Sequence, residues 1–378
     1  MGNRCQKHLG DLHQKRTRWR AAVIATVMLV SVNLTGLTRA YATVTTAEAT
    51  SIEEAFALIL DKDYEGAKNI ASPLAETGVA DAQHILGFLY ERGLGVEQSM
   101  EAALSFYEKA ATQGHADSQF ALGELAYTGQ GVKRNDVYAA QWFQLAASRG
   151  HPRAQTRLGY MYANGESVDR DMGRARSLFE TAAAAGEPDA QFNVATMLLV
   201  GEGKAPNYRQ AANWFEKAAE QGHADAQYNL ALLYDSPYLG DPDKAKTAKW
   251  MNAAAQSGMP AAMVAMGILV SGGAASSELS AADWFEGAAR AGDPQGQFLY
   301  AVALSEGDDR VRDINGAMAM LDAASRFGDA LEPELAENIA ALRKDLIRAG
   351  AQPNVVRQDV QKAQTGRLAD NALPVIRD

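Results

Sequence analysis

The chain has 378 residues, with 36 Lys and Arg against 46 Asp and Glu, which gives a net charge of −10. Without its first 42 residues, which hold seven basic residues and one Asp, the remainder carries a net charge of −16. Nucleic acids and anionic membrane surfaces bind clusters of Lys and Arg, so this balance argues against both as partners. A neutral or basic protein partner is compatible with it.

The first 42 residues have the pattern of a secretory signal peptide. A basic stretch up to Arg20 precedes an apolar run from Ala21 to Leu37, and Ala40-Tyr41-Ala42 supplies an A-x-A cleavage site. We expect cleavage after Ala42 and a periplasmic or secreted protein. The alternative is an uncleaved anchor in the inner membrane, facing the periplasm, because this run is near the lower limit of a membrane span. Only in that case would the membrane be a partner.

The region from residue 79 to residue 328 repeats one phrase, whose clearest copy runs from Ala226 to Tyr234. A fixed period of 20–50 residues predicts an array of stacked structural units. Here the period is 36, and a glycine closes each unit: Gly78, Gly114, Gly150, Gly186, Gly222, Gly258, Gly292 and Gly328. We therefore predict an all-α solenoid of about seven repeats, in which stacking buries what one hairpin leaves exposed.

Each unit reads as two helices joined by a loop. In the first copy, Ala103, Phe106, Tyr107 and Ala110 have the i, i+3, i+4, i+7 spacing of a helix face. Small residues share one position of the first helix: Gly87, Gly123, Gly159, Ala195, Ala231, Gly267 and Ala301. Small side chains let helix axes approach to about 8 Å, so a bulky residue at Gly123 is expected to cost about 1–3 kcal/mol.

The ends of the array differ from its middle. We assign residues 43–78 to a linker and an N-terminal half-repeat cap, with residues 79–328 forming the seven repeats. Residues 329–349 are expected to form a C-terminal capping helix, and 350–378 a flexible tail. The sixth repeat lacks two residues between Ser271 and Ser277, which predicts a slight bend.

The repeats resemble the Sel-one-like repeat (SLR) family, a relative of the tetratricopeptide repeats. The matching residues are Ala-x-Ala-Gln-x-x-Leu-Gly-x-x-Tyr from Ala80 to Tyr90, then Gly93-Leu94-Gly95-Val96, then Ala103 to Gly114. The resemblance implies a right-handed superhelix whose first helices line a concave face. It also implies an adaptor that holds a protein or peptide and has no catalysis or cofactor of its own. Pro237, in place of a loop glycine, and Met263, in place of Gln, depart from the pattern.

The positions that tetratricopeptide geometry directs into the groove carry aromatic and acidic residues. Such large, rigid anchors beside carboxylates suit an extended peptide with Lys or Arg. The alternative is that those at the position of Phe120 pack against the preceding repeat. The candidate partner-binding residues are Phe88, Phe120, Glu124, Tyr127, Tyr160, Phe192 and Tyr228.

Catalytic and metal sites have little support in the sequence. His115, His151 and His223 each follow a closing glycine in separate units, so we interpret them as turn residues rather than ligands. Serine-nucleophile, zinc-protease and phosphate-loop patterns are all missing from the chain. We predict an exported adaptor or regulator of the bacterial envelope, not an enzyme. A scaffold for exopolysaccharide secretion is the alternative, and a β-lactam-interacting hydrolase a remote one.

Overall fold

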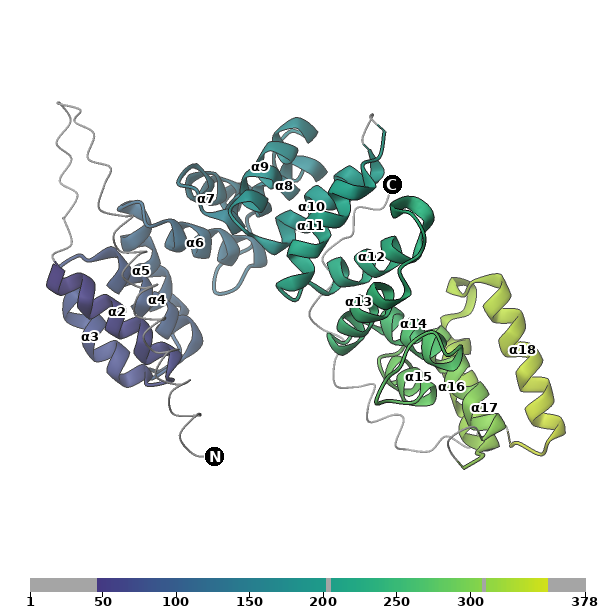
Figure 1. The fold of residues 1–378 in the computed structure, drawn as a ribbon. Helices are drawn as coiled ribbons and strands as arrows, with labels where there is room; N and C mark the ends of the chain where they lie inside the picture. Colours follow the sequence, from purple (N-terminus) through teal and green to yellow (C-terminus); the bar gives the residue numbers. More distant parts are fainter. Residues whose placement is uncertain (1–45, 202–204, 308–310, 353–378) are drawn as a thin grey trace, which may run out of the picture. The chain divides into compact units, whose positions relative to one another are not determined.

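The computed structural model describes residues 46–201, 205–307 and 311–352, and the repeats belong to one compact unit that begins at Glu48. Within these ranges the regular structure consists of 17 α-helices and two short 3₁₀ helices, without strands (Figure 1). The prediction of an all-α solenoid is therefore confirmed. The predicted signal peptide, and most of the predicted tail, lie outside the described residues.

Seven helix pairs form the repeats. The first helices are α4 (Ala80–Arg92), α6 (Ala116–Thr128), α8 (Pro152–Asn164), α10 (Pro188–Val200), α12 (Ala224–Asp235), α14 (Pro260–Ser271) and α16 (Pro294–Glu306). The second helices are α5 (Met100–Thr112), α7 (Asp136–Ser148), α9 (Met172–Ala184), α11 (Tyr208–Glu220), α13 (Lys244–Gln256), α15 (Ala281–Arg290) and α17 (Ile314–Ala324). Two helices precede this array, α2 (Thr46–Leu60) and α3 (Tyr64–Glu76), and α18 (Pro333–Arg348) follows it.

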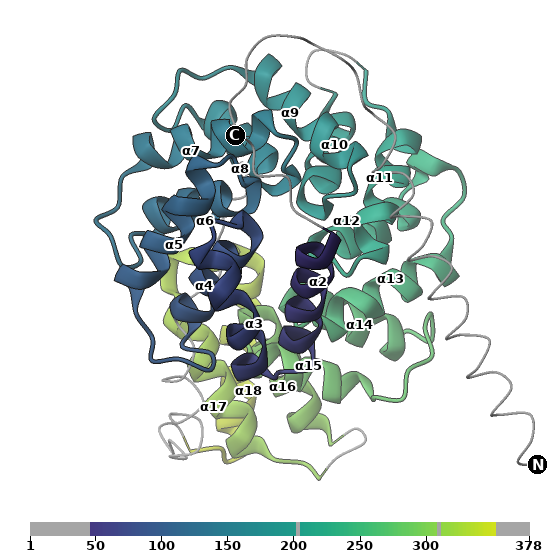
Figure 2. The same cartoon turned by 90° about the vertical axis from the view of Figure 1, so that its left-hand side faces the viewer.

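Each helix of the array packs mainly on the helices before and after it in the chain (Figures 1 and 2). The core is accordingly a row of small clusters rather than one centre. Clusters within the array are built around aromatic residues of a second helix, such as Phe143 of α7 and Phe215 of α11, and on alanines around them. This is the nearest-neighbour packing that gives repeat proteins their one-dimensional character.

Caps fix where the helices begin and end. The side chain of Asn135, for example, accepts a hydrogen bond from the Tyr138 amide at the start of α7, which satisfies a donor that the helix leaves free. At the other end of the hairpin loop, Gly129 ends α6 with a φ of 75°, a left-handed conformation that glycine adopts without a Cβ clash.

The shared small position lies against the aromatic ring of the second helix. A Cβ atom added to Gly123 would be 2.5 Å from Cε1 of Phe143, and one added to Gly87 would be 2.6 Å from Cδ1 of Tyr107. Since real Cβ atoms do not approach so closely, the ring occupies the space that a larger residue would need. The glycines thus set the distance between the two helices of a repeat.

Two departures from the repeat pattern have visible consequences. Pro237 opens the 3₁₀ helix η1 (Pro237–Leu239), and the preceding Ser236 is extended, so α12 ends without the left-handed glycine seen in α6. At the position of Met263, Gln227 of the preceding repeat donates from Nε2 to the carbonyl of Ala219 at 3.0 Å. Methionine has no such donor, so the sixth repeat cannot form this bond.

The terminal helices are less buried than those of the array. Only Ile339 and Leu346 are buried in α18, whereas α6 buries seven of its thirteen residues. In α2 the buried residues are Ile52 and Ala55. The handedness of the superhelix and the slight bend at the sixth repeat remain predictions.

Candidate functional site

A small cavity lies between the second and third repeats, at positions that the sequence assigned to the concave face. Tyr127 reaches it from the last turn of α6, and Tyr160 from the middle of α8. Glu166, in the loop that follows α8, closes another side, and Arg157 and Asn164 complete the polar lining. The floor is apolar, because Phe143 and Met161 are almost fully buried.

The carboxylate of Glu166 is held by two neutral donors. The Tyr127 hydroxyl donates to Oε2 at 3.3 Å, and Nδ2 of Asn164 donates to Oε1 at 2.9 Å. Burial, with a further contribution from Glu166, raises the pKa of Tyr127, so its hydroxyl remains a donor at neutral pH. Both described hydrogen-bond partners of Glu166 are therefore neutral, and its charge interacts at longer range with Arg134, whose guanidinium lies 5.3 Å from the centre of the Tyr127 ring.

The charge of Arg157, by contrast, is already balanced. Its Nε and Nη2 atoms donate to the two carboxylate oxygens of Glu124 at 2.9 and 3.0 Å. This two-pronged geometry fixes the guanidinium group and joins the second repeat to the third. Arg157 is thus a rigid wall of the cavity rather than a free cation.

Tyr160 is fixed in the same way. Its hydroxyl accepts a hydrogen bond from Nδ2 of Asn193 at 2.6 Å, and its ring lies edge-on to Phe179 with centroids 5.2 Å apart. Burial raises the pKa of Tyr160 to about 12. Tyr160 is therefore an anchored element of the cavity wall, while Tyr127 is the more accessible of the two tyrosines.

The volume limits what the cavity can hold. It measures about 50 Å³, whereas one water in the liquid occupies about 30 Å³ and typical ligand pockets measure about 300–1,000 Å³. The cavity can take the end of one side chain but not a substrate or cofactor of ordinary size. Its chemistry, two tyrosine rings beside one carboxylate, suits a cationic end group.

The other predicted binding residues lie elsewhere in the array. Phe120 is 8% exposed and stacks on His151, with ring centroids 4.6 Å apart. Phe192 stacks on His223 in the same way, at 4.8 Å. Both rings thus pack against the N-cap residue of the following first helix. Phe88 and Tyr228 are partly buried against the core.

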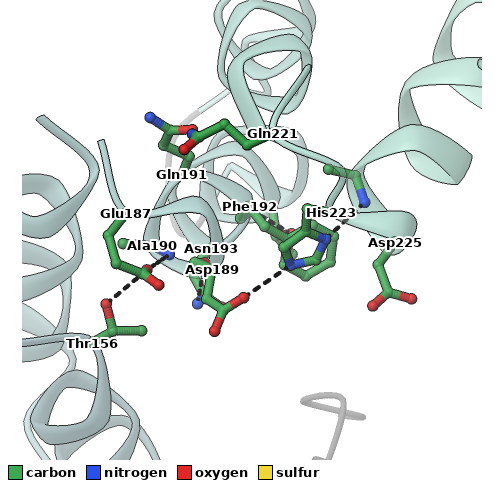
Figure 3. Close-up of polar contacts among 12 residues, drawn as sticks. Thr156, Glu187, Asp189, Ala190, Gln191, Phe192, Asn193, Gln221, His223 and Asp225 are labelled. Atoms are coloured by element: carbon green, nitrogen blue, oxygen red, sulfur yellow. Dashed lines mark hydrogen bonds and ion pairs between the residues drawn. The ribbon is translucent and has the colours of Figure 1, made fainter. Parts of the chain in front are cut away.

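Three of the four histidines of the array, His115, His151 and His223, are helix N-caps, and each joins two repeats. Nδ1 of His223 accepts from the Ala226 amide at 3.2 Å, while Nε2 lies 3.4 Å from Oδ1 of Asp189 (Figure 3). His115 with Asp81 and His151 with Asp117 make the same contacts, at 3.3 and 3.1 Å. Hydrogen bonding to His223 lowers the pKa of Asp189. The interpretation of these histidines as structural turn residues agrees with this geometry.

Where the histidine is replaced, a different contact joins the repeats. Glu187 takes the capping place at the start of α10, where it accepts from the Ala190 amide at 2.6 Å and from the Thr156 hydroxyl at 3.0 Å (Figure 3). The burial of Glu187 raises its pKa. Within the same repeat, Gln221 donates to Oε1 of Gln191 at 2.8 Å, as Gln113 does to Gln83 in the first repeat.

The sequence indicated Tyr127, Tyr160 and Glu124 for this site but not Arg157, Asn164 or Glu166. Arg157 replaces a position that is Ala121 one period earlier and Asn193 one period later, so its charge is particular to this repeat. Glu166 lies in the hairpin loop and follows no repeat rule. Its approach to Tyr127, 39 residues away, depends on how two successive loops are placed in space.

The described residues contain no cluster of three or more His, Cys, Asp or Glu side chains with the geometry of a metal site. Of the helices from α2 to α18, none combines the length and apolarity needed to cross a membrane. The apolar run from Ala21 to Leu37 lies outside this part of the chain.

The fold and the contacts between repeats define an α-solenoid of helix hairpins, a class of protein that generally serves as a scaffold for protein–protein interaction. The model of the Sel1 repeat matches seven successive segments: residues 80–115, 116–151, 152–187, 188–223, 224–259, 260–293 and 294–329. The chain therefore belongs to the Sel1 repeat family.

Solved structures include relatives of the same type. A Sel1 repeat protein from Oxalobacter formigenes is 28% identical, with a TM-score of 0.56, and the match covers 63% of this chain and 96% of that chain. The protein c5321, described as a protective antigen present in uropathogenic Escherichia coli strains and displaying an SLR fold, is 25% identical with a TM-score of 0.47. That match covers 83% of this chain and 77% of that chain. A comparison with curated proteins gave no match.

Proposed function

We propose that this chain is an adaptor of the bacterial envelope that binds an extended peptide segment of a protein partner. In this proposal the cavity between Tyr127 and Tyr160 receives a Lys or Arg side chain of the partner. The observation that carries the proposal is the carboxylate of Glu166, which borders the cavity and whose described hydrogen-bond partners are both neutral. Membership of a family of scaffolds that are typically not enzymes supports an adaptor role.

A cationic side chain would gain two interactions in the cavity. It would approach the faces or edges of Tyr127 and Tyr160 with its apolar stem, as long basic side chains commonly do. Its charged end would meet Glu166, where a charge-assisted hydrogen bond is stronger than a neutral one. Because the cavity holds only one side-chain end, the rest of the affinity has to come from neighbouring first helices.

The first helices offer acidic groups for that purpose. The side chains of Asp117 and Asp189 are 62% and 50% exposed, although each also contacts a histidine. A partner segment with more than one basic residue would therefore find further carboxylates along the array. This matches the expectation, from the acidic balance of the chain, of a neutral or basic partner.

The proposal can be tested without knowing the partner. A displayed library of random peptides is selected on the protein, and the enriched peptides are expected to share a Lys or Arg beside apolar residues. The variant Glu166→Gln should lose that preference, and Tyr127→Ala should weaken binding. Glu180→Gln on α9 and Tyr138→Ala on α7 are matched controls, because both side chains are exposed and lie outside the cavity lining.

Several results would contradict the proposal. Enrichment of acidic or purely apolar peptides would remove the role of Glu166. Equal binding by Glu166→Gln, Tyr127→Ala and the control variants would remove the site. Binding on a glycan array that needs Tyr127 and Tyr160 would instead favour the scaffold for exopolysaccharide secretion.

The envelope location is the second part of the proposal. The basic stretch, the apolar run and Ala40-Tyr41-Ala42 support export. Mass spectrometry of the protein from separated cell fractions tests it, and the expected amino terminus is Thr43 in the periplasmic or secreted fraction. An intact Met1 in the cytosolic fraction would contradict export, and an intact amino terminus in the membrane fraction would favour the anchored alternative.

A further inference from the structure

The last helix carries a groove of a chemistry unlike that of the chain as a whole. Helix α18 and the segment before it border an open cavity of about 520 Å³. The α18 residues along it recur at helical spacing, namely Ala336, Ala340, Arg343, Lys344, Ile347 and Arg348. We call this surface the C-terminal groove. Its lining includes three cationic side chains and no carboxylate, although the chain is acidic overall.

The C-terminal groove has apolar surface as well as charge. The side chain of Ile347 is 49% exposed, and Ala340 is also exposed. Two of the cations already have a carboxylate partner, because Arg343 pairs with Asp322 of α17 at 2.8 Å and the exposed Arg348 pairs with Asp345 of α18 at 3.2 Å. Lys344 and Arg348 lie one turn apart on the same side of α18 and are exposed. An amphipathic, acidic helix would complement this surface.

The first described helix of the same chain has that composition. Helix α2 contains Glu48, Glu53 and Glu54 and no Lys or Arg. Its exposed side bears Phe56 and Leu60, which are 42% and 83% exposed, with Glu53 and Glu54 beside them. Exposed residues Ala49, Glu53, Phe56, Ala57 and Leu60 follow the i, i+4, i+7, i+8, i+11 spacing. We call this stripe the α2 face.

The two surfaces also agree in length. The α2 face extends from residue 49 to residue 60, which is about 17 Å at a rise of about 1.5 Å per residue. The C-terminal groove extends along α18 from residue 336 to residue 348, which is about 18 Å by the same measure. An apolar helix face placed in an apolar groove, with opposite charges at the edges, is a common mode of recognition between proteins.

We infer that the C-terminal groove of one copy of this protein binds the α2 face of a second copy. Each copy would then present an acidic apolar helix at one end of its repeat array and a basic apolar groove at the other. Such an interface joins two different surfaces, so it continues from copy to copy into an open chain, or into a closed ring where the rotation between copies permits closure. Copies joined end to end would place the repeats of several chains in series.

Charge complementarity selects a second copy over other occupants. The net charge of −10 predicts general repulsion between copies, so association requires a local region where the signs are opposite. Lys344 and Arg348 facing Glu53 and Glu54 supply that region. Because a single helix in a groove is a small interface, the association should be weak and should depend on protein concentration. It should also weaken with salt, which screens exposed charges.

Sedimentation velocity of the full chain, over a roughly hundredfold range of concentration, measures the association. The average mass is expected to rise steadily with concentration, and to rise less in about 0.5 M salt than in about 0.05 M salt. The charge reversals Lys344→Glu with Arg348→Glu should weaken association about tenfold or more, and so should Glu53→Lys with Glu54→Lys. A mixture of these two double variants restores opposite charges at every junction, so it should associate like the parent.

A matched control separates a local effect from a change in net charge. Lys133→Glu with Arg209→Glu alters the net charge as much as the α18 variant, at exposed positions outside both surfaces. This control is expected to associate nearly as strongly as the parent, and more strongly than the α18 variant. Circular dichroism melting of each variant checks that it is folded.

Zero-length cross-linking identifies the contact itself. A carbodiimide joins amines to carboxylates, so Lys344 is expected to link to Glu53 or Glu54, and isotope labelling of half the molecules shows whether the link is between copies. A constant monomer mass would overturn the inference. Links from Lys344 to residues 1–45 or 353–378 of the same chain would do so as well, since those segments would then occupy the groove.

Discussion

The imidazole of His223 contacts Asp189 through Nε2 and caps helix α12 through Nδ1, so that one side chain serves two repeats at once (Figure 3). The pair is 3.4 Å apart, and the ring is also stacked on Phe192. The cap acts within one helix, while the other two contacts act between helices. Substitutions can separate these contributions.

The variant His223→Ala should lower the free energy of unfolding by about 1–2 kcal/mol, since it removes the cap and the contacts between repeats. The variant His223→Asn keeps a good N-cap residue but loses the ring. We expect it to recover part of the loss, roughly half, in urea unfolding followed by circular dichroism. Equal loss in both variants would show that the cap contributes nothing.

The contact between Gly123 and Phe143 gives a second test. The variant Gly123→Ala places a Cβ atom against the Phe143 ring and should destabilise the protein by about 1–3 kcal/mol through overpacking. The matched control is Gly287→Ala in α15, where the nearest atom is the flexible sulfur of Met263 at 3.2 Å. Helix propensity should make this control neutral or more stable by up to about 1 kcal/mol.

Thermal melting of both variants measures the difference. The repeats with alanine at the shared position, such as Ala195 against Phe215, show that the fold can accept a methyl group where the helices are placed for it. If Gly123→Ala melts at the same temperature as the parent, the second repeat can also accept a methyl group at the shared position. The close approach would then not set the helix spacing.

The repeat array is predictable from the sequence because its determinants are local and recur. Glycine at a turn, a capping residue after it and an apolar face on each helix all lie within one period of 36 residues, so each copy supports the others. The contact of His115 with Asp81 also recurs, with its two residues 34 positions apart. Its signal was in the sequence, since the Asp is present wherever the capping residue is His.

The cavity was only partly predictable, for a physical reason. Tyr127 and Tyr160 occupy repeat positions whose direction follows from helix geometry. Glu166 belongs to a loop, and a loop residue has no periodicity that fixes where its side chain points. A periodic position, in turn, does not give the exposure of a side chain. Phe120 lies at a groove position, yet His151 covers its ring.

The free energy of unfolding should depend on pH because His84 is buried in its neutral form. Burial lowers the pKa of His84 to about 4, and His115 is the next contributor. The unfolded chain binds a proton at His84 below a pH of about 6.5, while the folded chain does not. The contribution of neutral His84 to the free energy of unfolding is therefore fully present above pH 6.5. As the pH falls towards 4, this free energy should decrease by on the order of 2 kcal/mol.

The variant His84→Phe tests this assignment, because Phe120 and Phe192 occupy the same position in other repeats. Urea unfolding at several pH values should show a smaller decline between pH 6.5 and pH 4 in the variant. Asp81, Asp117 and Asp189 have pKa values lowered by hydrogen bonds to histidine, so their contribution is lost only below their usual range. Parallel curves for the variant and the parent would show that His84 does not titrate in this way.

The two tyrosines of the cavity should differ in what their hydroxyls contribute to stability. The Tyr160 hydroxyl belongs to the more buried of the two side chains and accepts from Asn193 over a short distance, 2.6 Å, so Tyr160→Phe should cost about 1 kcal/mol. The Tyr127 hydroxyl is part-buried and donates to Glu166 over a longer distance, 3.3 Å, so Tyr127→Phe should stay within about 0.5 kcal/mol of the parent. Thermal and urea unfolding of the two variants measure both values.

This difference decides which variant can report on binding. If Tyr127→Phe leaves stability unchanged but binds a peptide selected on the parent protein more weakly, the loss of affinity arises at the binding surface, because the fold is intact. Tyr160→Phe would weaken binding through the shape of the cavity and would lower stability at the same time. Should Tyr127→Phe prove the more destabilising of the two, its hydroxyl would be a structural contact that holds the loop of Glu166, and the proposed entry of a basic side chain beside it would lose its support.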